Sequence, residues 1–108
     1  MADTYTPTAE MARIARAVLE LRAGLPASRR AGTSVGIARA RDIANRRPMS
    51  LATVKRMASF FARHGSSPGS AAARRDRTSK AAQAWALWGG SPGRAWANRI
   101  VREADNAG

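Results

Sequence analysis

Large apolar side chains are scarce in this chain, and their scarcity limits the folds that it can adopt. Leucine, isoleucine, valine and phenylalanine together make up only 15 of the 108 residues. That share lies below the roughly 20% that usually accompanies folding in a strongly charged chain. Alanine is abundant instead, and it favours helix while burying little area. We therefore expect one small all-α domain over residues 1–108, with a modest core.

The spacing of apolar residues predicts about five short helices and no strand. Thr6 and Pro7 supply an N-cap and a first helical position, and Gly24 and Pro26 end this first helix near residue 23. Its apolar stripe recurs at intervals of three and four residues and consists of Met11, Ile14, Val18, Leu21 and Leu25.

Two further helices are predicted in the middle of the chain. Thr33 or Ser34 caps the second, and Pro48 closes it. Its predicted buried side consists of Val35, Ile37, Ala40, Ile43 and Ala44. Ser50 caps the third helix. The residues predicted to face inward there are Leu51, Val54, Met57, Phe60 and Phe61.

The last third of the chain begins with a segment that has no apolar period. Residues 65–79 are rich in glycine, serine and arginine and are predicted to form a flexible basic linker. Ser79 then caps a short fourth helix that ends at Trp88. The glycines at 89–90 break it, and residues 91–92 begin a fifth helix. The apolar side of that helix is Trp96, Ile100 and Val101.

Positive charge is concentrated in the middle of the sequence. Residues 29–80 hold eleven arginines and two lysines against only Asp42 and Asp76, which gives this stretch +11 of the formal +12. A genome rich in G and C would raise alanine and arginine everywhere, but it would not keep acidic residues out of the middle. A basic field of this kind is expected for a polyphosphate partner.

We expect basic residues between positions 29 and 63 to contact nucleic acid. Arginine doublets at 29–30, 46–47 and 74–75 lie in predicted loops, from which they reach phosphates easily. They are also compatible with solvated surface, although clustered like charges repel unless something neutralises them. The predicted contact residues are Arg29, Arg30, Arg39, Arg41, Arg46, Arg47, Lys55, Arg56 and Arg63.

The second and third predicted helices form a helix-turn-helix-like pair. In residues 50–57, Ser50 caps the third helix, Val54 anchors it, and Lys55 and Arg56 would meet a DNA groove. The turn is several residues longer than the usual tight one and lacks its glycine. The alternative is two packed helices with solvated basic faces.

The tryptophans are predicted to belong to the core rather than to stack on bases. Trp85, Trp88 and Trp96 lie at helical spacings in the least basic third of the chain, whereas stacking aromatics normally sit among basic residues. Residues 88–94 place backbone N–H groups and Arg94 at a helix start, which can hold an anion. The same residues can form an ordinary corner between helices.

No pattern indicates an enzyme. The absence of cysteine excludes disulfides and Cys-ligated zinc. His64, the only histidine, has no carboxylate cluster for a metal and no partner acid for general-base work. We predict that it caps its helix or faces phosphate. We expect no catalytic residue, no cofactor and no metal.

No segment of the sequence indicates a membrane protein or a targeted one. The apolar runs are too short to span a membrane, and the acidic residues Asp3, Glu10 and Glu20 argue against a transit peptide. We therefore expect a cytoplasmic protein with no membrane partner.

Four segments resemble a small basic domain that recurs in tailed-phage and prophage genomes, alone or attached to head and DNA-handling proteins. They are residues 32–45 (GTSVGIARARDIAN), 59–64 (SFFARH), 84–90 (AWALWGG) and 93–97 (GRAWA). The resemblance covers roughly residues 10–103. It implies a phage context and a single domain, with no mechanism attached.

These observations together predict a non-enzymatic nucleic-acid-binding protein, with DNA favoured over RNA. Arginines would contact the phosphates of double-stranded DNA, in the host cytoplasm or inside a phage particle. The alternative is a protein-interaction or virion-structural module whose basic face docks on an acidic protein.

Overall fold

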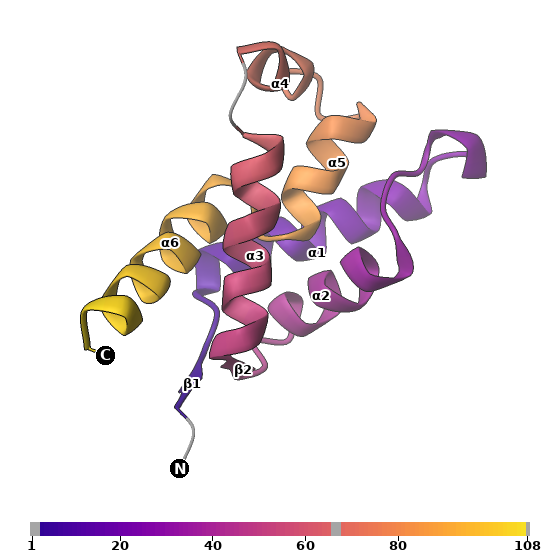
Figure 1. Cartoon of the computed structure of the whole chain (residues 1–108). Coiled ribbons are helices and arrows are strands. Elements are labelled where there is room, and N and C mark those ends of the chain that lie inside the picture. Colours follow the sequence, from indigo (N-terminus) through magenta and orange to yellow (C-terminus); the bar gives the residue numbers. More distant parts are fainter. Residues whose placement is uncertain (1–2, 66–67, 108) are drawn as a thin grey trace.

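The protein is almost entirely helical, as the sequence predicts. A computed structural model describes residues 3–65 and 68–107. Besides a short 3-10 turn at Ala27–Arg29, the helices are α1 (Ala9–Ala23), α2 (Ser34–Ala44), α3 (Leu51–His64), α4 (Pro68–Ala73), α5 (Lys80–Leu87) and α6 (Gly90–Ala107). They form a small all-α fold (Figure 1).

Side-chain caps begin these helices largely where the sequence places them. The hydroxyl oxygens of Thr33, Ser50 and Ser79 accept hydrogen bonds from the backbone N–H groups of Gly36, Thr53 and Ala82, respectively. Each bond satisfies one of the N–H groups that a helix start leaves unpaired. The predicted starts of α2, α3 and α5 are thereby confirmed.

A short strand pair changes the start of α1. Strand β1 (Thr4–Tyr5) pairs antiparallel with β2 (Met49–Ser50), with Thr4 opposite Ser50. The prediction of no strand is therefore wrong for these four residues. Pairing keeps the chain extended past Pro7, so Thr8 caps α1 instead of Thr6. A two-residue strand is too short to leave an alternating pattern in the sequence.

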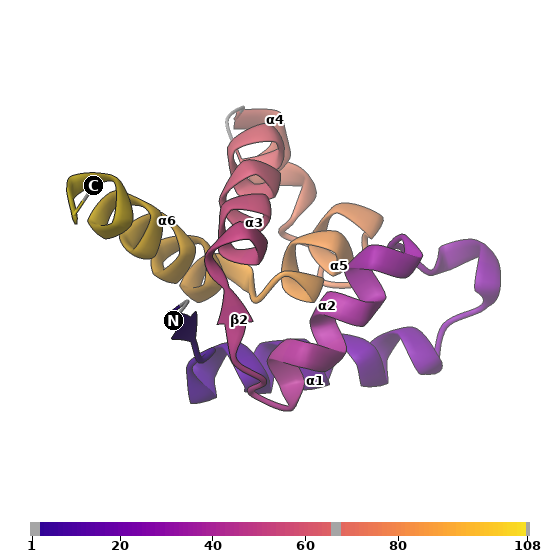
Figure 2. The same ribbon diagram turned by 60° about the horizontal axis from the view of Figure 1, so that its bottom comes forward.

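The helices pack in two groups that share α5. Helices α1 and α2 form an antiparallel hairpin, and α5 packs against both of them. Helix α3 stands across this hairpin and packs along α6. Figure 1 shows α3 upright between α6 and the α1–α2 pair, and Figure 2 shows it rising above that pair. This arrangement sets α3 apart from α2 along much of its length.

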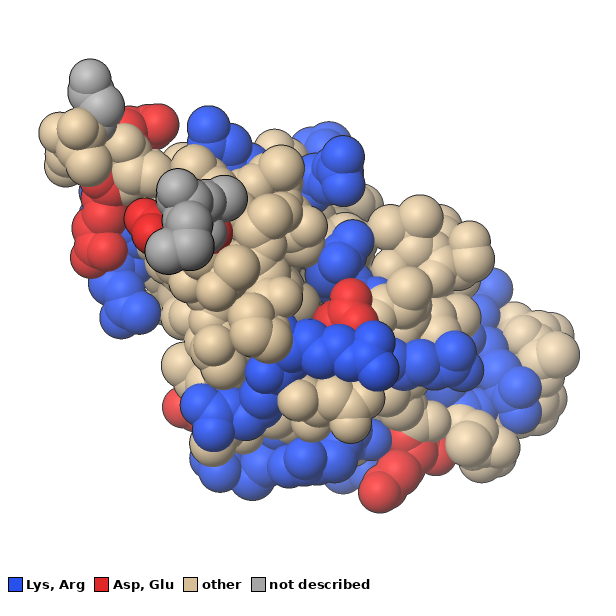
Figure 3. Space-filling view, turned by 90° about the horizontal axis from the view of Figure 1, so that it is seen from below, with Lys and Arg blue, Asp and Glu red and all other residues tan. Residues whose placement is uncertain are grey.

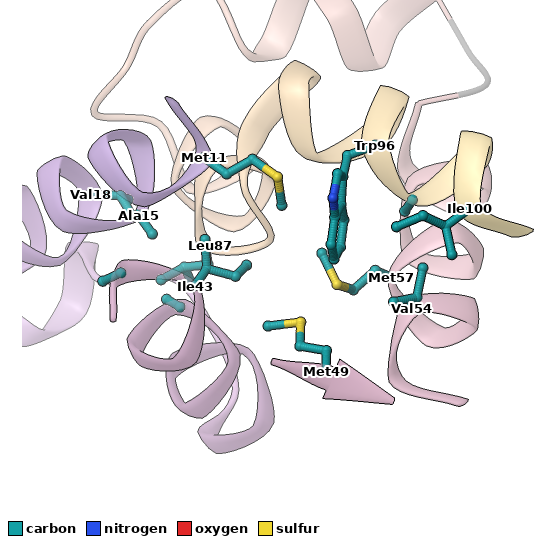
Figure 4. Packing of buried hydrophobic residues seen from close by; sticks show 13 residues of the cluster. Met11, Ala15, Val18, Ile43, Met49, Val54, Met57, Leu87, Trp96 and Ile100 are labelled. Carbon is teal, nitrogen blue, oxygen red and sulfur yellow. The ribbon is translucent and has the colours of Figure 1, made fainter. Parts of the chain in front are cut away.

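Methionines and one tryptophan fill the space between the two groups. Figure 4 shows the Trp96 ring of α6 standing between Met11 of α1 and the side chains of Val54 and Ile100, with Met57 beside it. All five residues are buried. Flexible methionine side chains adapt to irregular gaps, so this core compensates for the few large aliphatic residues.

Buried Gln83 joins α5 to two loops. Its Oε1 accepts from the backbone N–H of Ala31 (2.9 Å). Its Nε2 donates to the carbonyl oxygens of Arg29 (2.9 Å) and Thr78 (2.8 Å). The loop before α2 and the loop before α5 are therefore held by one fully buried amide.

One packing prediction in the middle of the chain is wrong. Val35, expected on the buried side of α2, is 55% exposed. Gly36, Ala40 and Ile43 set the buried face, and Val35 falls outside it because successive residues are about 100° apart around a helix.

The segment predicted as a flexible linker contains regular structure. Helix α4 occupies six of its residues, and Ser79 Oγ donates to Ala73 O (2.7 Å). Arg74 Nη1 donates to His64 O (3.3 Å), and the Arg74 guanidinium lies 3.8 Å from the centre of the Trp85 ring. The prediction overlooked the two Arg74 contacts because His64 and Trp85 lie outside the segment. Residues 66–67 lie outside the described part.

Candidate nucleic-acid interface

A basic groove lies between α2 and α3. Although every residue of both helices is described, the two helices do not pack closely against each other. The hollow between them has a volume of about 470 Å³. Its lining residues are Val35, Lys55, Arg56, Ser59, Arg63 and Trp88.

A second hollow continues this groove toward the start of α2. It has a volume of about 430 Å³ and shares Arg63 and Trp88 with the first. Gly32, Thr33 and Gly36 form its α2 side, and its other lining residues are Phe60, His64, Ala84 and Leu87. We call the two hollows together the α2–α3 groove. Among the described residues that line it, none is acidic.

Helix α3 supplies most of the positive charge of this groove. Lys55, Arg56 and Arg63 are exposed. Arg56 and Arg63 are seven residues apart, so they lie two turns apart on the same side of the helix. Their opposite face, with Val54, Met57 and Phe61, is buried. Burial of the apolar side thus orients the basic side outward.

Asp42 holds two further arginines at one edge of α2. Its Oδ2 accepts from Arg39 Nη1 and its Oδ1 from Arg47 Nη1, both at 3.3 Å. Arg39 lies one turn after Val35 on the same side of α2, toward the groove. The Nε of Arg39 is buried and has no hydrogen-bond partner among the described residues. One of the two acids in the basic stretch therefore orders two of the predicted contact residues.

Other predicted contact residues also serve the fold. Arg46 Nε donates to Pro7 O (2.8 Å), and its backbone has a φ of +50°, which is unusual outside glycine. Arg30 donates to the carbonyl oxygens of Leu25 (2.9 Å) and Ala23 (3.3 Å), at the end of α1. These two arginines tie the loops to α1, so replacing them would disturb the fold as well as any contact.

The structure does not bring all nine predicted residues together. Lys55, Arg56 and Arg63 line the groove. Arg39 and Arg47 are not among its lining residues, and both pair with Asp42. Arg41 is exposed about 200° around α2 from Arg39, so it points elsewhere. Arg29 and Arg30 lie in the loop at the far end of the α1–α2 hairpin.

A wider band of positive charge surrounds the turn after α2. Figure 3 shows Lys and Arg side chains spread over α1, α2 and this turn, with a few acidic side chains among them, and further acidic side chains near the C-terminal end of α6. Arg16 of α1 joins the band, because its Nη1 donates to Ala44 O (3.2 Å). The sequence analysis missed Arg16 because it lies in the flank whose net charge is close to neutral.

The loop before α5 carries the other acid of the basic stretch, Asp76. Asp76 Oδ1 accepts from the Thr78 hydroxyl (2.7 Å) and the Thr78 backbone N–H (2.9 Å). These bonds, together with the charge of Arg29, hold the pKa of the Asp76 carboxyl below its ordinary value. Arg29 also donates to the Thr78 hydroxyl (3.4 Å), so this loop is an ordered polar cluster.

Helices α2 and α3 depart from a tight helix-turn-helix. The chain between them includes β2, which pairs with β1, and the two helices have separate packing partners. Ser50 caps α3 and Val54 anchors it as predicted. The basic outer face of α3 is present, but the compact two-helix unit is not.

The tryptophans differ in their surroundings. Trp85 and Trp96 are buried, whereas Trp88 is half-buried and lines both hollows of the groove. Gly89 and Gly90, with φ of +100° and +66°, turn the chain sharply after Trp88 and are themselves buried. Residues 88–94 therefore form a packed corner between α5 and α6.

No group of three or more potential metal ligands occurs in the described part of the chain. None of the described helices is long and apolar enough to cross a membrane. No known protein family, no curated protein and no solved structure matches this chain. The geometry of the groove and the distribution of charge are therefore the basis for a functional proposal.

Proposed function

We propose that this is a non-enzymatic nucleic-acid-binding protein that contacts phosphates, mainly those of double-stranded DNA. The observation that carries the proposal is the α2–α3 groove. Lys55, Arg56 and Arg63 are exposed along it, and none of the described residues that line it is acidic. Arginine and lysine side chains that meet phosphates supply affinity without reading sequence.

The ion pairs at Asp42 support phosphate contact rather than oppose it. Asp42 neutralises one charge, but it pairs with both Arg39 and Arg47. The largely buried Arg39 is held in place by this pair, which lowers the entropy that it loses on binding a ligand. The 3.3 Å pairs also leave other N–H groups of each guanidinium available, since arginine has five donors. The positive charges at the groove are thus partly positioned before binding.

Salt dependence tests the proposal directly. If about six phosphates are neutralised, log affinity falls with log salt at a slope of about −5 on a duplex of about 20 base pairs. We would measure fluorescence anisotropy of the labelled duplex from low to moderate salt. A slope near zero, or no binding at low salt, would overturn nucleic-acid binding.

Two single substitutions separate phosphate contact from base reading. Arg47→Ala should weaken binding to all sequences alike and reduce the salt slope by about 1. Arg56→Ala should behave in the same way if α3 lies on the backbone. If α3 enters a major groove, Arg56→Ala should instead weaken one preferred sequence by about 1–3 kcal/mol more than random DNA. We expect the first behaviour, because α2 and α3 do not form a compact helix-turn-helix.

The second candidate function is docking on an acidic protein. Exposed Val35 beside the basic residues favours it, since an apolar side chain at the centre of a charged patch suits a protein partner. Comparing retention on immobilised DNA and on an acidic protein across a salt gradient distinguishes the two. The resemblance to a phage-borne domain supports a setting in host cytoplasm or a phage particle, and nucleic acid that co-purifies with the protein would support the first function.

A further inference from the structure

Aromatic rings line one end of the α2–α3 groove. The Phe60 and Trp88 rings are stacked, with centroids 4.9 Å apart and planes 15° apart. The His64 ring lies 4.5 Å from Phe60. Phe60 is buried, whereas Trp88 is half-buried and His64 is exposed. The rings of Trp88 and His64 are therefore accessible in the groove, and the buried Phe60 ring packs against both of them.

Trp88 differs from the other tryptophans in its access to a ligand. The Nε1–H of Trp85 donates to Ser91 Oγ (3.3 Å). Within the described part of the chain, the Nε1–H of Trp88 makes no hydrogen bond. The edge of the indole that carries this N–H faces Gly36 of α2, where an added Cβ would lie 3.6 Å from Nε1.

Positive charge lies within reach of the same rings. Arg63 lines both hollows together with Trp88, and Arg56 lies two turns earlier on α3. A basic groove that carries an accessible aromatic ring is the arrangement by which proteins bind unpaired nucleotides, with the phosphate on the cations and the base on the ring. A base inside a duplex cannot reach such a ring, because both of its faces are already stacked.

We infer that the α2–α3 groove, in addition to the phosphate contact proposed above and dependent on it, binds one unpaired nucleotide. Its base stacks at Trp88, and its phosphate is held by Arg63 and Arg56. The preferred ligand is then a DNA duplex that ends in a single strand, since the surrounding basic surface engages the paired part. The groove residues carry no sequence preference in this contact, because every base has a stacking face.

The test compares two labelled duplexes that differ only in a short single-stranded overhang. For the full-length protein, we expect the duplex with the overhang to bind more tightly by roughly 5- to 150-fold, as the stacking of one base predicts. Trp88→Leu should abolish this advantage, and Trp88→Phe should keep much of it. Equal affinity of the parent protein for both duplexes would overturn the inference and leave the proposed function intact, whereas binding to neither would overturn both.

A second pair of variants does not depend on how Trp88→Leu folds. Val35→Glu places a carboxylate at the groove from an exposed position, and Asn98→Glu makes the same charge change on an exposed residue of α6. Val35→Glu should reduce the overhang advantage severalfold more than Asn98→Glu. Equal effects of the two substitutions would place the unpaired nucleotide outside this groove and refute its assignment there.

Discussion

Replacing Gln83 tests how the basic loops are held in place. The Gln83→Leu substitution keeps a side chain of similar size but removes all three hydrogen bonds of the amide. The buried N–H of Ala31 is then unsatisfied, which costs about 1–3 kcal/mol. The two half-buried carbonyl bonds contribute about 0.5–1.5 kcal/mol each. Because leucine recovers part of this through apolar burial, we expect the free energy of unfolding to fall by about 2–4 kcal/mol.

Urea denaturation followed by far-ultraviolet circular dichroism measures this change, and amide exchange at Ala31 locates it. Gln83→Glu is the matched control. It keeps the acceptor for the Ala31 N–H but turns an oxygen toward the carbonyls of Arg29 and Thr78. We expect it to be at least as destabilising as Gln83→Leu at neutral pH and less so in acid, where the protonated carboxyl donates one bond. A loss below about 0.5 kcal/mol for Gln83→Leu, the size of an ordinary surface change, would refute this reasoning.

Two further predictions concern the core and the acidic cluster. Trp96→Ala should cost about 3–5 kcal/mol because its ring fills the space between α1, α3 and α6, and unchanged thermal melting would contradict that role. Thr78→Val should raise the pKa of Asp76 toward its ordinary value in a carboxyl NMR titration, since the Thr78 hydroxyl is the first cause of the lowering. A carboxyl whose pKa is lower in the folded state contributes its full stabilisation at pH values above its unfolded-state pKa of about 3.9. This stabilisation is lost as the pH falls through the pKa of the folded state. A parent and variant with the same Asp76 titration would show that the hydroxyl is not the cause.

Local signals in the sequence were sufficient for the helices. Apolar spacing identified α1, and hydroxyl residues before apolar runs located the starts of α2, α3 and α5. Both signals act within one or two helical turns, so they are readable without knowing the rest of the fold. The basic outer face of α3 follows from the same periodicity, because burial of Val54, Met57 and Phe61 leaves Lys55, Arg56 and Arg63 outside.

What the sequence determined by itself, therefore, is an all-α chain with its charge gathered on the middle helices. Tertiary structure alone decided how those charges are used. Arg46 donates to Pro7 O and Arg29 to the Thr78 hydroxyl, both far away in the sequence, whereas the pairs of Asp42 with Arg39 and Arg47 are local in the sequence. Gln83 and Trp88 gained their roles from residues distant in the sequence. Contacts between residues distant in the sequence depend on which helix surfaces pack together, and a local sequence pattern does not predict that packing.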